Sequence, residues 1–529
     1  MLVAALAFLG WCTLAAIERP GVEYDEVLFV NAALGGHYPN FVSSRLFGVP
    51  TMVMPYTGAL KSWLYYPIFE VFGVSVTSVR VPAIAMLVAT IVLAFVLARR
   101  LFGAWPAALL AVVMATDPAF MTMAKADWGP VALSALLRIG ALAAYFAWAH
   151  TGSARWLWTL AAALVLGVFN KLDYLAFVAA LGLAAVIVDH RGIVARVRRA
   201  PAAAALPLVA LASLLLVEYV EIVRPARAFP VARSDADLLE RASDFWYLAR
   251  TTMDGTAIFP YMTTRPLDHR TAIAAVAASA VAFAVGLVLW RLSRLRRGID
   301  AELVPFAEAA HVSAFVLVLL LAMTAILVAT PEAIGPHHAM LLWPLPALLA
   351  VSLLGTATRL PAARLRTGAV AVLAVGLVWL AGTQVRVAES YRSGFASDSA
   401  WASGWTPEIY AVVDAVRRVA PGVDRVMTAD WGFGNQLLAF GGDDVRRRLD
   451  DAWGTFAFGT PEAINQLADA ALRGRRTVLV LHASGAEQMP GTHAKAEAML
   501  RRLHPAHLQL LYRGDAELAY VVDDRPEMR

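Results

Sequence analysis

The sequence predicts a polytopic α-helical membrane protein that ends in a soluble α/β domain, and three observations lead to this fold class. Of the 529 residues, 59% are hydrophobic and only 16% are charged, whereas soluble domains carry about 25% charged residues. The apolar residues gather in runs of membrane-spanning length. The composition becomes that of a soluble protein only near the carboxyl end.

We predict about eleven transmembrane helices, because roughly 20 apolar residues cross a bilayer. Lys171 and Asp173 interrupt the apolar stretch between residues 156 and 188, and we interpret them as a tight hairpin turn at the membrane surface. The predicted spans are residues 2–17, 78–98, 104–121, 130–149, 156–169, 174–188, 202–221, 271–290, 312–329, 338–354 and 369–385.

The first apolar run, residues 2–17, has the length of either a short span or a cleaved signal peptide. No Lys or Arg precedes the run, which favours a span. The run contains Cys12, the single cysteine of the chain. No disulfide can therefore form within the chain, and an outer domain must be held by its core alone.

Arginine placement predicts the side that each loop faces, because basic clusters stay in the cytoplasm. The dense clusters fall in alternate short loops, at residues 99–100, 155, 191–199, 291–297 and 359–366. The other loops are then on the outer face of the cytoplasmic membrane, together with the carboxyl terminus. Two of these outer loops, residues 18–77 and 222–270, are long, and the stretches 26–34 and 57–72 are amphipathic enough to lie along the membrane surface.

Residues 390–529 have the composition of a soluble domain, which separates them from the membrane domain of residues 1–389. Segments 424–428, 477–482, 508–512 and 518–522 have the pattern of strands, and segments 407–419, 461–472 and 493–503 that of helices. This alternation predicts a small α/β domain. The glycine-rich stretch 430–434 follows a strand but lacks the phosphate-loop pattern, so we interpret it as a turn into a helix.

Three acidic residues near predicted span ends are candidates for catalysis. Asp25 and Glu26 follow the first span closely, although acids also favour the first turn of any surface helix. Asp127 lies in the short loop Lys125-Ala126-Asp127-Trp128-Gly129-Pro130, where it could instead cap the next helix. The predicted topology places all three carboxylates at the same membrane face.

Lysines are rare in this chain, and three of the four, Lys61, Lys125 and Lys171, map to the predicted outer mouth of the membrane domain. Lysine is a compact charge that suits phosphate. The alternative is that these side chains only reach for the membrane interface. Arginine occupies the interface elsewhere in the chain, which favours a specific role for the lysines.

Two adjacent histidines, His337 and His338, enter the predicted tenth span after Gly335-Pro336. They have the chemistry to bind a phosphate or a metal, although a metal would need further ligands that the sequence does not place. The alternative is that they are ordinary interfacial residues.

These motifs together resemble the GT-C glycosyltransferases, specifically the protein O-mannosyltransferase and lipid A aminoarabinose transferase group. Tyr24-Asp25-Glu26 with Asn31-Ala32-Ala33 resembles the Asp-Glu signature after the first span of that family. Residues 56–67, 117–127 and 335–346 resemble the later part of the first outer loop, the second-loop segment and the late phosphate motif. The likeness covers roughly residues 1–390, and His337-His338 replaces the usual Arg-Tyr type.

The resemblance implies a GT-C-like membrane domain and a polyprenyl-phosphate-linked sugar as the donor. Asp25 would accept the proton of the acceptor hydroxyl, and Glu26 and Asp127 would orient the acceptor or Asp25. The donor phosphate would bind Lys61 together with Lys171 or with His337 and His338. The sequence leaves open the sugar, any divalent metal, and whether the acceptor is a protein, a lipid or a glycan.

The alternative function is that of a transporter or lipid flippase, which would also have many spans. Transporters usually place charged residues near the middle of the membrane. Here the span centres are almost free of charge, and the exceptions, Arg138 and Glu218, lie near span ends. The polar residues gather at one face, which favours an interfacial enzyme. The net charge of +5 is dispersed between apolar runs, so nucleic-acid binding is not indicated.

Overall fold

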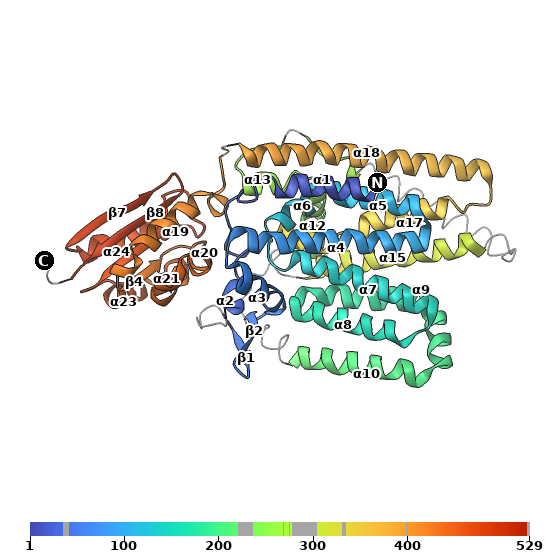
Figure 1. Cartoon of the computed structure of the whole chain (residues 1–529), viewed down its shortest axis with the longest axis horizontal. Helices are drawn as coiled ribbons and strands as arrows, with labels where there is room; N and C mark the ends of the chain where they lie inside the picture. Colours follow the sequence, from blue (N-terminus) through green and yellow to red (C-terminus); the bar gives the residue numbers. More distant parts are fainter. Residues whose placement is uncertain are drawn as a thin grey trace.

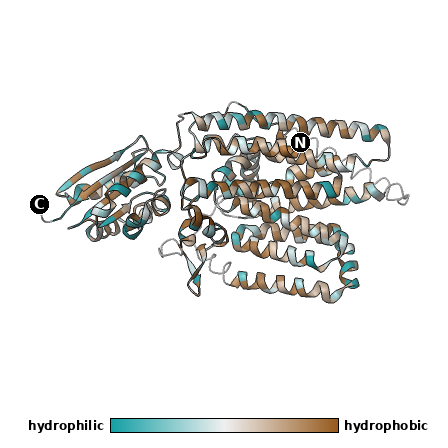
Figure 2. Ribbon diagram, viewed as in Figure 1, coloured by the Kyte–Doolittle hydropathy of each residue, from teal (hydrophilic) through white to brown (hydrophobic). Residues whose placement is uncertain are grey.

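A bundle of long helices and a smaller region built on a β-sheet meet end to end in the computed structural model, with the loop that follows the first helix between them (Figure 1). The structure describes residues 1–34, 42–220, 236–267, 269–274, 276–277, 304–330, 335–397 and 400–525. Residues 400–525 are called the C-terminal region below. Hydrophobic residues dominate the bundle, whereas the C-terminal region mixes both kinds (Figure 2).

The helices of the bundle confirm a multi-pass membrane protein. They are α1 (Leu2–Leu14), α4 (Val76–Phe102), α5 (Ala104–Thr116), α6 (Pro118–Lys125), α7 (Val131–Thr151), α8 (Ala154–Asn170), α9 (Leu175–Arg199), α10 (Pro201–Glu218), α15 (Val304–Ala329), α17 (Leu345–Ala357) and α18 (Ala363–Ala396). Within the described part of the chain, seven helices are long and apolar enough to cross a membrane, or up to eight if α5 and α6 form one bent span. Helices α1 and α8 are shorter but apolar.

The number of eleven spans stays a prediction, because most of the expected span at residues 271–290 lies outside the described residues. The predicted hairpin at Lys171 is confirmed: α8 ends at Asn170, a short 3₁₀ turn η2 (Leu172–Tyr174) follows, and α9 begins at once.

The predicted span at residues 104–121 is divided into α5 and α6, which are bent by 58° relative to each other. Asp117 ends α5 with extended backbone and accepts a hydrogen bond from the Phe120 N–H at 2.9 Å, which caps α6. Pro118 cannot continue the hydrogen bonding of α5 but fits the first turn of a new helix. The chain therefore turns here rather than running on.

The loop between α1 and α4 folds into α2 (Val30–Ala33), a small antiparallel sheet in the order β1–β2–β3 (Ser44–Leu46, Val49–Met54, Thr57–Gly58) and α3 (Leu60–Phe72). The expectation that residues 26–34 lie along a membrane surface is wrong. Residues 26–33 are all buried, because their apolar side chains pack between α3, α4 and the C-terminal region. Helix α3 buries one face, with Tyr65 and Phe69, and exposes the other.

The C-terminal region is α/β, as its sequence predicts. Its five-stranded sheet has the order β5–β4–β6–β8–β7, in which β5, β4 and β6 are parallel and β6, β8 and β7 antiparallel. The four predicted strands are present as β4 (Arg425–Thr428), β6 (Arg476–His482), β7 (His507–Arg513) and β8 (Glu517–Asp523). The sequence analysis missed β5 (Leu449–Asp451), which is too short to show alternation.

Helices cover both faces of this sheet. One apolar cluster joins the sheet to α22 (Trp453–Phe458), α23 (Pro461–Ala471) and α24 (Thr492–Leu503). A second cluster joins the opposite face to α19 (Glu408–Val419), α20 (Gly434–Phe440) and α21 (Gly442–Arg448). Neighbouring residues of β4 divide between the clusters, Val426 in one and Met427 in the other, as the alternation of a strand requires.

Arg80 ties the loop after α1 to the bundle. Its Nε donates to Glu26 Oε1 at 2.5 Å and its Nη2 to Glu26 Oε2 at 2.9 Å. The remaining bonds run to backbone carbonyls of Ile17 (2.5 Å), Pro20 (3.0 Å) and Gly21 (3.3 Å). Both charged side chains are fully buried, so the five N–H groups of the guanidinium are matched by five acceptors inside the protein.

Replacing Arg80 by Met is expected to lower the free energy of unfolding by about 3–5 kcal/mol, because Glu26 would stay buried without a counter-charge. Adding Glu26→Gln should recover part of that loss, since an amide replaces the orphaned carboxylate. Thermal unfolding of the detergent-solubilised protein measures both effects. Arg100→Met, at an exposed position of the same helix, is the matched control, and equal melting of the Arg80 and Arg100 variants would contradict the expectation.

Candidate active site

Asp25 stands out in its loop because it is the one residue between Gly21 and Ala33 that is not buried. Its backbone N–H donates to Glu23 Oε2 at 2.7 Å. Its carboxylate forms no hydrogen bond or ion pair with any residue that the structure describes. A partly exposed residue in an otherwise buried and well-bonded segment, with a carboxylate that has no partner among the described residues, is available to an incoming molecule.

Two further acids hold this loop from inside. Glu26 Oε2 accepts a hydrogen bond from the Glu23 N–H at 3.3 Å, and Glu23 in turn accepts one from the Asp25 N–H. Burial raises the pKa of Glu23 well above its ordinary value, and the neighbouring charges of Asp25 and Glu26 raise it further. Glu26 is thus connected to Asp25 by hydrogen bonds that run through Glu23. Arg80 balances the charge of Glu26.

Lys61 and Asp127 form a buried ion pair. Lys61 Nζ lies 2.7 Å from Asp127 Oδ2 and also donates to the Asp127 and Gly129 carbonyls at 3.3 and 2.9 Å. The Tyr65 hydroxyl donates to the same Asp127 oxygen at 3.0 Å. The three N–H groups of Lys61 are therefore occupied, and its charge acts on the site through space rather than through a free ammonium group.

Burial is the main influence on the titration of these groups. It raises the pKa of Asp127 to about 7, against the lowering effect of Lys61, and it lowers the pKa of Lys61, against the raising effect of Asp127. Partial burial also raises the pKa of Asp25 above the ordinary value, while the charges of Lys171 and then Lys61 lower it. Asp25 therefore has two cations close to it and a proton affinity greater than that of a free carboxylate.

The turn at Lys171 places a positive charge near several of the predicted site residues. Lys171 Nζ pairs with Asp173 Oδ2 at 3.1 Å, and both side chains remain partly exposed. The Leu172 N–H donates to the Tyr56 carbonyl at 3.0 Å, which fixes the turn against the loop after α1. Lys171 lies close enough for its charge to act on Asp25, His337 and His338.

His337 and His338 begin the short helix α16 (Pro336–Ala339), which leads through a 3₁₀ turn η5 (Met340–Leu342) into α17. Their ring centroids are 4.0 Å apart, and His338 Nδ1 accepts a hydrogen bond from the Gly335 N–H at 3.1 Å. His337 Nδ1 is buried and has no partner among the described residues. The two rings thus lie beside Lys171 with hydrogen-bonding capacity to spare.

The Trp128 ring packs against aromatic rings from three other parts of the chain. Its ring centroid lies 5.2 Å from Tyr261 of α13 (Ile258–Met262), 5.2 Å from His337 and 5.1 Å from Trp405 of the C-terminal region. The charges of Glu23 and Asp25 act on Tyr261, whose pKa burial raises to about 12. The second long loop therefore reaches the same site as the first.

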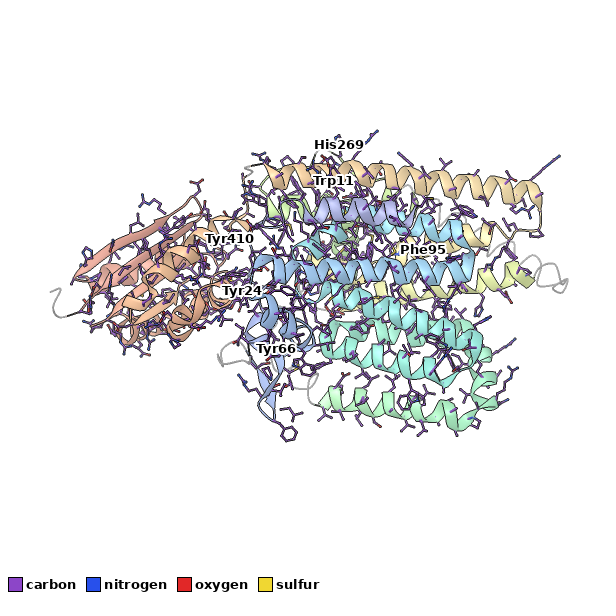
Figure 3. The ribbon with its side chains drawn as sticks, viewed as in Figure 1. Trp11, Tyr24, Tyr66, Phe95, His269 and Tyr410 are labelled. Carbon is purple, nitrogen blue, oxygen red and sulfur yellow. The ribbon has the colours of Figure 1, made fainter. Side chains whose placement is uncertain are left out.

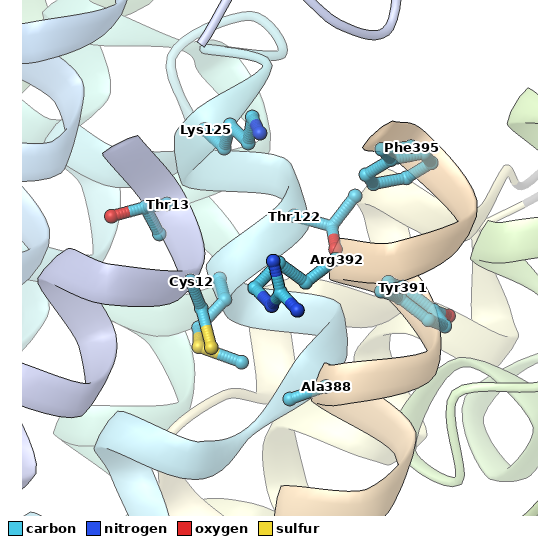
Figure 4. A pocket seen from close by; sticks show the side chains of 9 residues that line it. Cys12, Thr13, Thr122, Lys125, Ala388, Tyr391, Arg392 and Phe395 are labelled. Atoms are coloured by element: carbon cyan, nitrogen blue, oxygen red, sulfur yellow. The ribbon is translucent and has the colours of Figure 1, made fainter. Parts of the chain in front are cut away.

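Lys125, the third lysine of the predicted outer mouth, lies apart from this group. It lines a small open pocket between α1, α6 and α18, together with Cys12, Thr122 and Arg392 (Figure 4). Its Nζ donates to the Ala15 carbonyl at 2.6 Å. The structure therefore brings together Asp25, Glu26, Lys61, Asp127, Lys171, His337 and His338, and separates Lys125 from them.

Glu23, Arg80 and Trp128 contribute to the site without having been found from the sequence. Arg80 carried a usable signal: it lies at the outer end of its predicted span, whereas the dense arginine clusters mark the opposite face. Trp128 lies in the predicted loop, but an aromatic next to a span is ordinary at a membrane interface. Nothing in the run Glu23-Tyr24-Asp25-Glu26 distinguishes which acid is buried.

The arrangement pairs one accessible carboxylate with nearby cations and imidazoles. A carboxylate in this setting can accept a proton, and Lys171 with the histidines can bind an anion. No group of three or more His, Cys, Asp or Glu side chains that could hold a metal ion occurs in the described part of the chain. The roles of the individual residues stay predictions.

A family model described as dolichyl-phosphate-mannose-protein mannosyltransferase matches residues 58–217. No curated protein sequence matches the chain. Among solved structures, ArnT from Cupriavidus metallidurans in the apo state is similar with a TM-score of 0.54 and 14% identity, over 98% of this chain and 97% of ArnT. ArnT bound to undecaprenyl phosphate gives 0.50 and 13%, over 100% and 98%.

The Archaeoglobus fulgidus oligosaccharyltransferase in complex with Zn and sulfate is similar with a TM-score of 0.52 and 12% identity, over 99% of this chain and 73% of that one. Such low identities establish a shared fold, and the chain is accordingly a multi-pass membrane protein of the GT-C fold. The family-model match over residues 58–217 and this shared fold agree with the resemblance of the motifs to the GT-C group.

Cysteine labelling tests the predicted exposure and sidedness, because the only native cysteine, Cys12, is buried. In a Cys12→Ala background, Asp25→Cys should react with a membrane-impermeant thiol reagent in sealed right-side-out vesicles. Thr151→Cys, at an exposed position of a predicted inner loop, should react only after permeabilisation, and the buried Ala32→Cys in neither state. Labelling of Thr151→Cys but not Asp25→Cys in sealed vesicles would reverse the predicted orientation.

Proposed function

We propose that this protein transfers a sugar from a polyprenyl-phosphate-linked donor to an acceptor on the outer face of the cytoplasmic membrane. The observation that carries the proposal is Asp25, a partly exposed residue whose carboxylate has no partner among the described residues and on which the charges of Lys171 and Lys61 act. The fold shared with ArnT, which has been solved with undecaprenyl phosphate bound, supports a lipid phosphate as the leaving group.

In the proposed step, an acceptor hydroxyl attacks the anomeric carbon of the donor sugar while its proton passes to Asp25. The new bond joins the acceptor oxygen to the anomeric carbon, and the bond from that carbon to the phosphate oxygen breaks. The products are the glycosylated acceptor, polyprenyl phosphate and a protonated Asp25. Attack from the side opposite the phosphate would invert the anomeric configuration, as the resemblance to the family implies.

The departing phosphate gains negative charge, so the site must supply positive charge at that point. Lys171 is suited to this because its side chain is partly exposed and forms a single ion pair among the described residues, with Asp173 at 3.1 Å. His337 and His338 add hydrogen bonds from the adjoining helix. Lys61, although paired with Asp127, contributes a positive electrostatic potential at the site. Glu26 holds the loop that carries Asp25 in place through its hydrogen bond with Glu23.

Asp25→Asn is expected to abolish sugar transfer, because an amide cannot accept the hydroxyl proton and general-base catalysis is worth about 10²–10⁴ in rate. The assay incubates membranes with a panel of labelled polyprenyl-phosphate sugars, with and without a chelator, and separates lipid from protein products.

Glu70→Gln, at an exposed position of α3, is the control for a neutralised acid on the same loop. Transfer by Asp25→Asn at the wild-type rate would remove Asp25 from the mechanism. Failure of the wild-type protein to transfer from any donor would instead favour a transporter or flippase.

Lys171→Met is expected to move the acidic limb of the kcat/KM profile to higher pH. Asp25 must be deprotonated to act as a base, so activity is lost as the pH falls through its pKa. The positive charge of Lys171 lowers that pKa, and removing the charge lets it rise. Lys171→Arg keeps the charge and should keep the limb near its wild-type position. An unchanged limb in Lys171→Met would show that the two groups do not interact.

A further inference from the structure

The C-terminal region bonds directly to the residues that lead into Asp25. The Tyr410 hydroxyl donates to the Glu18 carbonyl at 2.8 Å, and the Gly21 N–H donates to the Trp405 carbonyl at 2.7 Å. Gln436 Nε2 donates to the Val22 carbonyl at 3.1 Å. Tyr24 and Tyr410 lie at the junction of the two parts (Figure 3). The loop after α1 is therefore held by Arg80 on one side and by the C-terminal region on the other.

Tyr24 is the most firmly held of these residues. Its hydroxyl donates to Asp451 Oδ2 at 2.8 Å, and its ring centroid lies 4.9 Å from that of Trp431. The other oxygen of Asp451 accepts a hydrogen bond from the Thr428 hydroxyl. Gly434 makes room for this carboxylate, because a Cβ there would come within 2.2 Å of it. The close approach of α20 to Asp451 thus requires glycine.

The peptide group between Tyr24 and Asp25 is bonded at both ends. Asn435 Nδ2 donates to the Tyr24 carbonyl at 3.1 Å, and the Asp25 N–H of the same group donates to Glu23 Oε2 at 2.7 Å. A peptide group is planar, so two bonds on opposite edges set the orientation of the whole plane. The orientation of that plane in turn fixes the direction of the Cα–Cβ bond of Asp25.

We infer that the C-terminal region positions the candidate catalytic base: Asp451 and Asn435 hold Tyr24 and thereby direct the carboxylate of Asp25 into the site. The inference rests on the proposed function, because it assigns Asp25 the role of the base. Asp451, Asn435 and Tyr24 are positioning residues, which act through Asp25 and do not themselves contact the reacting atoms.

Tyr24→Phe tests the inference with the smallest change, since it removes one oxygen and keeps the ring against Trp431. It should lower kcat by roughly 10–100-fold, the scale on which small misplacements of catalytic groups act, and leave the KM for the donor within about twofold because the phosphate site is untouched. Asp451→Leu removes both acceptor oxygens and should lower kcat similarly, whereas Asp451→Asn keeps one acceptor oxygen and should retain more activity.

Combining Tyr24→Phe with Asp451→Leu should cost little more than either change alone, because both remove the same hydrogen bond. Asp450→Asn is the matched control. Asp450 is the neighbouring residue of β5 and pairs with Arg425 at 2.9 Å, away from the loop after α1. Thermal unfolding of each variant shows whether the fold is retained.

The outcomes separate this inference from the proposed function. If the wild-type protein transfers no sugar, the proposed function fails. Suppose instead that the wild-type protein transfers sugar, that Asp25→Asn is inactive, and that Tyr24→Phe and Asp451→Leu keep the wild-type kcat. Positioning by the C-terminal region is then overturned, while the role of Asp25 as the base is retained. Equal losses in Asp450→Asn and Asp451→Leu, or fully additive losses in the double variant, would also overturn it.

Discussion

The buried ion pair of Arg80 and Glu26 is the interaction on which the candidate site depends. Arg80 lies near the start of α4, at the end of the bundle that meets the loop after α1, and matches its five N–H groups to a carboxylate and three carbonyls of that loop. Burying two charges is costly unless they are paired and hydrogen-bonded. Here both conditions are met, so the loop has one well-defined path, and Asp25 is the one residue between Gly21 and Ala33 that is not buried.

At the candidate site, two buried ion pairs lie next to charged residues that remain partly exposed. Arg80 with Glu26 and Lys61 with Asp127 are each buried and bonded internally. Lys171 and Asp173 are partly exposed, and the Asp25 carboxylate has no partner among the described residues. This contrast separates groups that hold the loops from groups that can meet a substrate, and it gives Lys61 and Asp127 a structural task that the sequence did not indicate.

Much of the fold follows from local sequence, because hydropathy, strand alternation and glycine or proline signals act over short distances. The apolar runs become helices, the hairpin at Lys171 is present, and four strands of the C-terminal region lie where their alternation placed them. The bend at Asp117 and the three-residue strand β5 were missed, since one depends on how α5 and α6 pack and the other is too short for a pattern. The motifs around Asp25, Lys61 and Asp127 pointed to one face, and the structure brings them into one cluster.

The sequence by itself determined that the chain is a multi-pass membrane protein, that its motifs resemble the GT-C group, and which titratable residues were worth considering. Only the tertiary structure decided which of them are paired. Arg80 and Glu26 are 54 residues apart in the chain, Lys61 and Asp127 are 66 apart, and Tyr24 and Asp451 are 427 apart. The partner of a charge is set by which distant segments pack together, and composition and spacing carry no record of that packing.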